Sequence, residues 1–253
     1  MKILILATKS LSSNLLINSL SKDYFLEVLF ENKVSKRVFW VNRLKRLGFI
    51  AVTGQILFLL LTYLLKVFNK QELDCLSGED HNSISPSKNI SIKYIDSVNS
   101  DESIERIRDT NPDLVILNGT RIVSKKVLSS IGCLFINTHC GITPKYRGVH
   151  GGYWAIYNND LDNYGVTVHK VDSGIDTGDI LYQDKVDYDP KDNYFTYPIK
   201  QYLAALPLIK KVIKQIEVGE NINAFKREDL ESKLWFHPTI FQYLYGLFFK
   251  RVK

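Results

Sequence analysis

The sequence is poor in cysteine, with only Cys75, Cys133 and Cys140 among 253 residues. Three cysteines cannot supply the even-numbered framework of a disulfide-stapled secreted domain, so we expect a reducing compartment. Neither these cysteines nor the five histidines have the spacing of metal ligands. We therefore expect no metal site.

The opening residues are not expected to be a secretory leader. The sequence opens with the short apolar run Ile3 to Ala7, which ends at the polar residues Thr8 to Ser10 without a cleavage site. This pattern predicts a first buried strand, and we expect a cytoplasmic protein. The length and the 45% content of hydrophobic residues are sufficient for one main core with an appendage.

Predicted strands and helices alternate along the chain. Apolar or alternating runs predict strands at residues 2–7, 24–31, 90–95, 114–117 and 133–136. Helices are predicted from Ser12, where Ser12 to Asn14 supply the amino-terminal cap, from Asp101, which has acidic neighbours in its first turn, and from Ile122 to Leu128. This alternation is typical of an α/β protein with a doubly wound sheet.

Three polar side chains follow two of these apolar runs. Asn137 and His139 are two residues apart, so both emerge on one face if the strand at 133–136 continues into them. Asp176 follows a second alternating run, residues 166–171, and a Ser-Gly turn signal, so it can fold back beside His139. An amide, an imidazole and a carboxylate together indicate acyl transfer.

In such a reaction, the amide of Asn137 and a protonated His139 would stabilise an oxyanion, while Asp176 would pair with His139 or accept a proton from the attacking amine. The amine attacks directly, so Cys140 is expected to be a bystander. For His169, a structural role and a role in the site both remain open. His150 lies beside three glycines in a predicted mouth loop, where substrate contact and simple exposure remain open.

The motifs Asn137-x-His139, Pro144-x-Tyr-Arg-Gly and His169-x-Val-Asp-x-Gly-Ile-Asp-x-Gly resemble the N-formyltransferase fold family. This family includes phosphoribosylglycinamide, methionyl-tRNA and sugar N-formyltransferases. The resemblance covers about residues 112–181, and more weakly residues 2–20. It implies a Rossmann-like formyltransferase domain, catalytic roles for Asn137, His139 and Asp176, and N10-formyltetrahydrofolate as the formyl donor.

The resemblance also implies two sets of binding residues. The donor would contact Thr120, Arg121, Ile122, Val123, Val171, Asp172 and Gly174. Ser12, Ser13 and Asn14 would contact the acceptor, and Lys145, Tyr146, Arg147 and His150 are further candidates for acceptor contact. Ser12 to Asn14 resemble a Gly-Ser-Asn turn that binds substrate phosphate in the purine enzyme, although Lys9 and Leu11 stand where that enzyme has glycines.

The segment Leu47–Leu65 has no charged residue and is bracketed by Lys45-Arg46 and Lys66. Its length suits a membrane span, but a single span would separate the first two strands from the rest of the sheet. The remaining alternatives are a helix packed on the core, a homodimer contact, or a helix lying on an anionic membrane surface. The basic cluster from Lys33 to Arg46 could meet phosphates, lipids or nucleic acid, or be a solvated face.

We therefore expect a catalytic domain at residues 1–205, with a hydrophobic helical insertion at 46–70 and a polar loop at 74–89. Residues 206–253 are predicted to form a helical, aromatic extension.

By resemblance and elimination, the expected substrate is a primary amine of an amino sugar, carried on a nucleotide, for surface glycan synthesis. The residues after Leu181 show no β-barrel pattern, which argues against methionyl-tRNA and against a nucleic-acid partner, and the purine enzyme lacks the apolar insertion. Two alternatives remain: an enzyme that formylates another small amine, as phosphoribosylglycinamide formyltransferase does, and a non-catalytic scaffold that binds a membrane or a partner.

Overall fold

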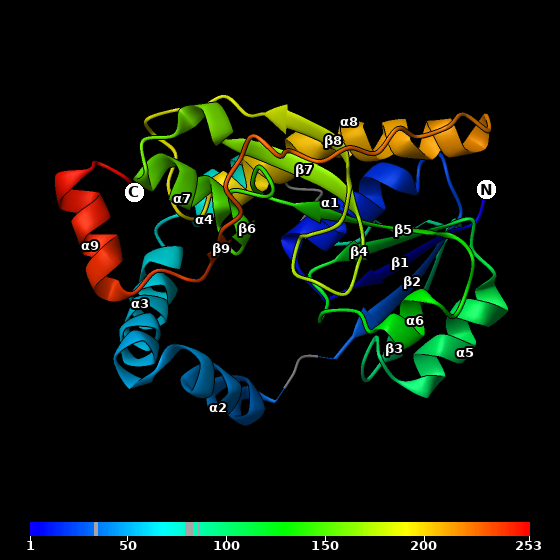
Figure 1. Ribbon diagram of the computed structural model, residues 1–253, viewed down its shortest axis with the longest axis horizontal. Coiled ribbons are helices and arrows are strands. Elements are labelled where there is room, and N and C mark those ends of the chain that lie inside the picture. Colours follow the sequence, from blue (N-terminus) through cyan, green and yellow to red (C-terminus); the bar gives the residue numbers. More distant parts are fainter. Residues whose placement is uncertain (33–34, 79–82, 86) are drawn as a thin grey trace.

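A seven-stranded sheet forms the centre of the protein in the computed structural model, which describes residues 1–32, 35–78, 83–85 and 87–253 (Figure 1). The strand order across the sheet is β3-β2-β1-β4-β5-β7-β8. The strands are β1 (Ile3–Ala7), β2 (Leu26–Glu31), β3 (Ile90–Ile95), β4 (Leu114–Asn118), β5 (Leu134–His139), β7 (Gly165–Lys170) and β8 (Ile180–Lys185).

Strands β1 to β5 are parallel, and β7 is antiparallel to both β5 and β8. From β1 the chain builds the sheet outwards in one direction through β2 and β3, and in the other through β4 and β5. Ligands of such open α/β sheets bind beyond the carboxyl ends of the strands, near the point where the order reverses. The predicted doubly wound, Rossmann-like fold is confirmed.

Side chains alternate between two cores, one on each face of the sheet. Ile3 and Ile5 pack with α1 (Leu11–Leu20) and α8 (Tyr197–Glu217), which cover one face. Leu4 and Leu6 pack with α5 (Asp101–Thr110) and α6 (Lys125–Leu128) on the other face (Figure 1). Because neighbouring residues of β1 point to opposite faces, both cores share the same strand.

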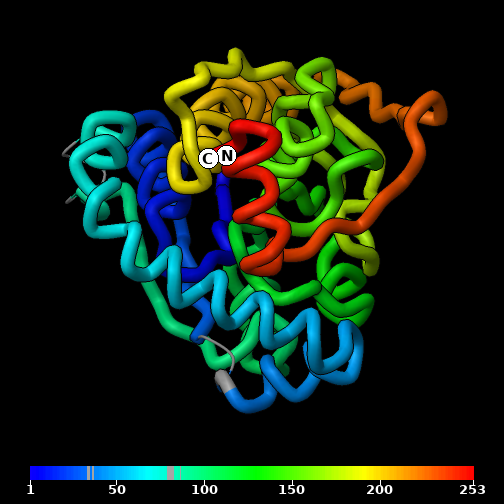
Figure 2. Tube along the Cα trace, turned by 90° about the vertical axis from the view of Figure 1, so that its left-hand side faces the viewer, coloured from blue at the N-terminus to red at the C-terminus, as the bar shows by residue number. Residues whose placement is uncertain are grey.

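A third core of aromatic residues lies beside the sheet. It joins α3 (Phe49–Lys66), α7 (Gly151–Tyr157) and α9 (Ile240–Phe249). Figure 2 shows one end of α9 meeting α3, where Gly54 lies against Thr239 and the rings of Phe58 and Tyr243 are 5.1 Å apart. Together with α2 (Lys36–Leu47), α3 and α9 make up what we call the helical lobe.

Several expected boundaries differ from those observed. Helix α1 begins at Leu11 because Ser10, not Ser12 to Asn14, is its cap and accepts a hydrogen bond from the Ser13 backbone N–H at 3.2 Å. Helix α6 begins at Lys125 because Ser124 caps it. The prediction that the helix begins at Ile122 is therefore wrong, since residues 122–124 are not helical.

The expected helix at 47–65 is present as α3, but the insertion is longer than predicted. It begins with α2 and continues through α4 (Lys70–Ser77), so residues 74–77 of the expected loop are helical, and residues 79–82 and 86 lie outside the described residues. Helix α8 crosses the expected domain boundary at residue 205. Its residues Ile209, Val212 and Ile213 are buried in the core that β1 shares with α1. Helix α8 therefore belongs to the domain that contains the sheet.

Candidate active site

The carboxyl end of β5 carries the two polar residues that the sequence placed there. Asn137 and His139 lie on β5, and in the antiparallel pairing with β7, Asn137 is opposite His169. The side chains of this pair meet, because the Asn137 Nδ2 and His169 Nε2 atoms are 3.2 Å apart. Sheet register therefore brings His169, whose role was left open, into the site.

Asp176 completes a cluster of four side chains. Its loop follows β7 and folds back, so that Asp176 Oδ2 lies 3.4 Å from His139 Nδ1. Its other oxygen, Oδ1, lies 3.4 Å from Asn137 Nδ2 and 3.5 Å from His169 Nε2. Residues that are 39 positions apart in the sequence thus contact one another as predicted.

Neighbouring residues fix the Asp176 carboxylate. The Gly148 backbone N–H donates to Asp176 Oδ2 at 2.9 Å, and Arg147 donates to the Ile175 carbonyl at 3.2 Å. Burial alone would raise the pKa of Asp176, but the charge of His139 and the hydrogen bonds from His169 and Gly148 outweigh it and hold the pKa well below its ordinary value. Asp176 is therefore ionised throughout the physiological range.

Both ring nitrogens of His139 face acceptors. Nε2 donates to the Tyr146 carbonyl, and Nδ1 faces the Asp176 carboxylate. A carbonyl and an ionised carboxylate can only accept hydrogen bonds, so both contacts orient the ring. The cluster thus brings together an imidazole, an amide donor and a carboxylate, the groups that an oxyanion-stabilising site uses.

A cavity of about 530 Å³ opens at this cluster. Asn137, His139, His169 and Asp176 form part of its wall. All seven residues predicted to contact the donor line it as well: Thr120, Arg121, Ile122, Val123, Val171, Asp172 and Gly174. Its size falls in the range of small-molecule sites, which is roughly 300 to 1,000 Å³.

The Arg121 side chain points away from that cavity. Its guanidinium lies 3.2 Å from the buried carboxylate of Glu31 and donates to the Asn32 carbonyl at 2.8 Å. Glu31 also accepts the Arg121 backbone N–H at 3.0 Å. These contacts fix the turn at residues 119–122. Within the described residues, the backbone N–H groups of Ile122 and Val123 have no hydrogen-bond partner.

The structure does not bring Ser12, Ser13 and Asn14 to the cluster. Ser12 and Ser13 accept hydrogen bonds from the buried Asn118 amide at 3.1 and 2.8 Å, which fixes the end of β4. Asn14 lines a separate cavity with Lys9. Although this segment resembles a phosphate-binding turn, the hydrogen bonds of Ser12 and Ser13 give it a structural role.

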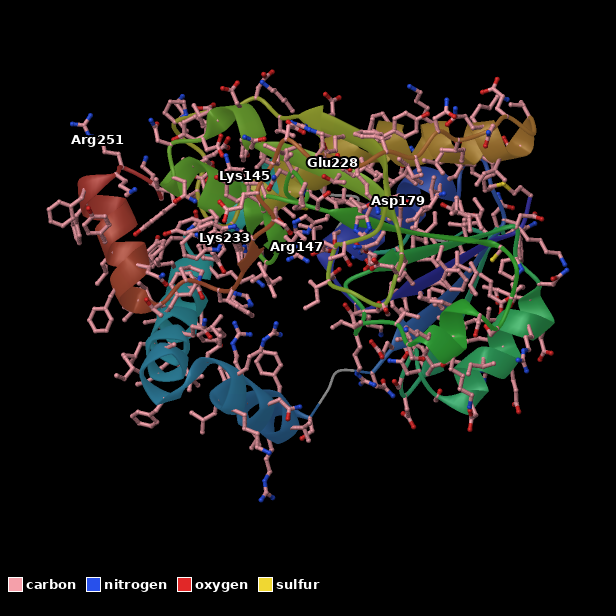
Figure 3. The ribbon with its side chains drawn as sticks, in the orientation of Figure 1. Lys145, Arg147, Asp179, Glu228, Lys233 and Arg251 are labelled. Atoms are coloured by element: carbon pink, nitrogen blue, oxygen red, sulfur yellow. The ribbon has the colours of Figure 1, made fainter. Side chains whose placement is uncertain are left out.

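Lys145 and Tyr146 also point elsewhere. Both contact Asp160: the Lys145 Nζ at 2.6 Å, and the Tyr146 hydroxyl, which donates at 2.8 Å. Tyr146 is fully buried and stacks on Trp235, while Lys145 lies beside the short pair β6 (Arg147–Gly148) and β9 (Leu234–Trp235), next to the segment that carries Lys233 (Figure 3). We therefore do not assign these two side chains to acceptor binding.

His150 is not in an open mouth loop, because Tyr194 and His237 enclose it. Its Nε2 lies 2.5 Å from the Tyr194 hydroxyl, which is 3.3 Å from His237 Nδ1. Burial first, and then the neighbouring His237, hold the pKa of His150 well below its ordinary value. Burial, together with the charge of Arg43, lowers the pKa of His237 to about 4.

These two histidines should make the fold sensitive to acid. Each has a folded-state pKa below the unfolded value near 6.5, so each stabilises the fold fully above that pH and loses its contribution as the pH falls. Between pH 7 and pH 5, His237 alone should cost about 2 kcal/mol of unfolding free energy. Thermal unfolding across this range checks it, and His237→Gln should flatten the dependence. An equally steep dependence in that variant would contradict the assignment.

A second cavity of about 750 Å³ adjoins the first and was not predicted. The two share Phe39 of α2, Val149 and the turn at residues 119–122. Arg43 and Arg46 of α2 line the second cavity. The sequence indicated only a basic cluster at Arg43 and Arg46. It could not predict that these residues line a cavity, because the cavity depends on where α2 packs in the folded protein.

The chain is similar in sequence to known formyltransferases. The sequence model of the family described as Formyl transferase matches residues 65–200, just over half of the chain. The methionyl-tRNA formyltransferase of Halothermothrix orenii is 34% identical over 146 residues, 56% of this chain and 45% of that protein. That of Methylacidiphilum infernorum is 47% identical over 94 residues, 36% of this chain and 28% of that protein. The chain thus spans half or less of the length of these curated relatives.

Solved structures show the same fold at low identity. A sugar N-formyltransferase from a Shewanella species superposes with a TM-score of 0.58 at 16% identity, covering 93% of this chain and 76% of that one. The phosphoribosylglycinamide formyltransferase of Streptococcus pneumoniae gives 0.54 at 19% identity, covering 86% of this chain and 99% of that one.

Proposed function

Because the chain belongs to the formyl transferase family, we propose that it transfers a formyl group from N10-formyltetrahydrofolate to a primary amine of a nucleotide-linked amino sugar. The observation that carries this proposal is the cluster of Asn137, His139 and Asp176 on the wall of a cavity of suitable size. An amide, a cation and a carboxylate are the groups that amine formylation needs.

The cavity of about 530 Å³, which we call the donor cavity, suits a folate. Leu117, Ile122, Val123 and Val171 give it apolar walls for a flat ring. The backbone N–H groups at 122 and 123, which have no partner among the described residues, can meet the polar edge of that ring. When bound there, the folate would supply the activated formyl group. The residues of the chain would hold it beside Asn137 and keep water away from it.

The polar cluster would act on the charges that develop during transfer. Asn137 would donate an N–H to the formyl oxygen as that oxygen becomes negative, with the protonated His139 supplying positive charge nearby. The contacts of Asn137 Nδ2 are long, at 3.2 and 3.4 Å, so a stronger acceptor can replace them. Asp176, which is ionised, would take the proton that the attacking amine loses, directly or through water, and pass it to the donor nitrogen whose bond to the formyl carbon breaks.

The second cavity suits an acceptor that carries phosphate. Arg43 donates through Nε to Gln55 at 2.6 Å, but one of its terminal nitrogens is buried without a partner within the described residues. Arg46 lies over the Phe236 ring at 5.0 Å, and the ion pairs of the described residues include neither arginine. A diphosphate would satisfy both cations while its sugar reaches the first cavity.

Arg43→Gln and Arg46→Gln should each raise KM for a nucleotide-linked acceptor by about tenfold or more, because each removes a charge-assisted hydrogen bond to phosphate. KM for the donor should stay within about twofold. Steady-state kinetics measure both. Lys45→Gln, on the same helix but outside the lining of the cavity, is the matched control. An equal rise in KM for the acceptor in all three variants would contradict a phosphate site in the second cavity.

Incubation with N10-formyltetrahydrofolate and a panel of nucleotide-linked amino sugars, followed by mass spectrometry, tests the proposal. A formyl adduct on one of them is the expected result. Methionyl-tRNA belongs in the panel as the second candidate, because the curated relatives above bear that name and Arg43 and Arg46, which line the second cavity, could also meet RNA phosphates. Formylation of methionyl-tRNA alone would replace the sugar acceptor, and no adduct on any amine would refute the activity.

A further inference from the structure

The helical lobe presents an unusually apolar surface. On α3, Ile50, Leu57, Leu60 and Leu64 follow one another at helical spacing and are 83%, 46%, 58% and 63% exposed. On α9, Phe241, Tyr245, Phe248 and Phe249 form a second exposed stripe. We call these two stripes the apolar face. Soluble proteins rarely expose contiguous apolar surface of this kind unless it binds something.

The opposite sides of both helices are buried in the aromatic core. Phe58 of α3 and Tyr243 of α9 pack there, so the two exposed stripes point away from the same cluster. By length and composition α3 could cross a bilayer, the one described helix to qualify. However, the buried Gln55 donates to the His237 carbonyl at 2.8 Å and accepts from Arg43, so lipid cannot surround α3.

The charged side chains of the helical lobe itself are of one sign. None of the 27 Asp and Glu residues of the chain lies between residues 32 and 71 or between residues 232 and 253, the two segments that contain the lobe. Exposed cations lie near the ends of its helices, including Lys66, Lys70, Lys250 and Arg251. Arg251 projects outward beyond the end of α9 (Figure 3).

We propose that the apolar face docks peripherally on an anionic lipid bilayer, with α3 and α9 in the interface and the surrounding lysines and arginines on the headgroups. Apolar burial and attraction to anionic lipid act together in this kind of binding. A second copy of the chain fits less well, because a two-fold dimer pairs a patch with itself and would bring two cationic rims together. The charge pattern therefore favours lipid over a homodimer.

Co-sedimentation with vesicles tests the proposal on the full chain. Vesicles of equal parts phosphatidylglycerol and phosphatidylcholine should bind the protein at least about tenfold better than phosphatidylcholine alone, since each Lys or Arg near an anionic surface contributes about a fivefold gain. Raising NaCl from about 0.05 M to about 0.5 M should release most of the bound protein, because the Debye length shortens.

The triple variant Leu57→Glu, Leu60→Glu, Leu64→Glu should lower the vesicle-bound fraction by at least about tenfold, since it places three anions in the interface. The matched control is Phe25→Glu, Leu161→Glu, Val218→Glu. Those three residues are similarly exposed, at 46% to 55%, on other surfaces, and their replacement should leave binding unchanged. Circular dichroism checks that both variants are folded.

Three results would overturn the proposal. The first is a parent protein that ignores anionic vesicles at low salt, which decides the question even if the triple variant does not fold. The second is equal loss of binding in the control variant. The third is a parent dimer on light scattering that the triple variant converts to a monomer without any vesicle binding by the parent, since a second copy would then cover the apolar face.

Discussion

Replacing His139 with alanine should lower kcat by about 100- to 1000-fold, the loss that follows removal of one oxyanion-stabilising group from other acyl-transfer sites. The substitution removes the ring whose two nitrogens face Tyr146 and Asp176. KM for the donor should change little, because the apolar walls of the donor cavity remain. Steady-state formyl transfer to the acceptor identified by mass spectrometry measures this.

Asn137→Ala should cause a loss of similar size, and the double variant with His139→Ala should lose less than the product of the two, because both groups act on one oxygen. Asp176→Asn keeps the left-handed backbone at Asp176, whose φ is 50°, while removing the charge. It should lower kcat by about 100-fold or more.

Cys140→Ala is the matched control for the cluster. Cys140 directly follows β5, but burial raises the pKa of its thiol to about 12, so it cannot act as a nucleophile at neutral pH. Its kcat should stay within about threefold of the parent. Near-normal turnover in a folded His139→Ala protein, or a large loss in Cys140→Ala, would refute the assigned roles.

Gly178→Ala should abolish most activity without removing a catalytic group. A Cβ at Gly178 would lie 1.8 Å from the Lys170 carbonyl oxygen, so the loop between β7 and β8 must move. That loop carries Asp176 and the donor-cavity residues Val171 and Asp172. Because a displacement of about 1 Å can cost about 100-fold in rate, we expect at least that loss in kcat/KM.

Gly132→Ala serves as its control, since nothing lies within 4 Å of a Cβ there. Activity and melting temperature are measured for both variants. Full activity in Gly178→Ala would mean that the position of the loop does not control the reaction.

The local sequence pattern was sufficient to predict the part of the site that lies on the sheet. Asn137 and His139 follow a buried strand at a spacing of two, and strand geometry alone puts them on one face. The motif around Asp176 was informative because its glycines permit the tight return of the loop. His169 was left undecided, since only the β5–β7 register shows that it lies opposite Asn137.

Other features depend on contacts that no local pattern reports. The glycines around His150 suggested an exposed loop, yet Tyr194, which is 44 residues later, covers it. Tyr146 belongs to a motif but its side chain is buried, and its hydroxyl donates a hydrogen bond to Asp160. The cavity lined by Arg43 exists because α2 folds across from the turn at residue 121. In each case tertiary packing outweighed a local signal.

The most direct measurement is a crystal structure of the protein with a folate analogue whose formyl group cannot be transferred. The flat ring should lie between Ile122 and Val123 on one side and Val171 on the other, with the oxygen of the analogue's formyl-like group within hydrogen-bond reach of Asn137. An analogue ordered elsewhere, with Asn137, His139 and Asp176 untouched, would contradict the account of this site.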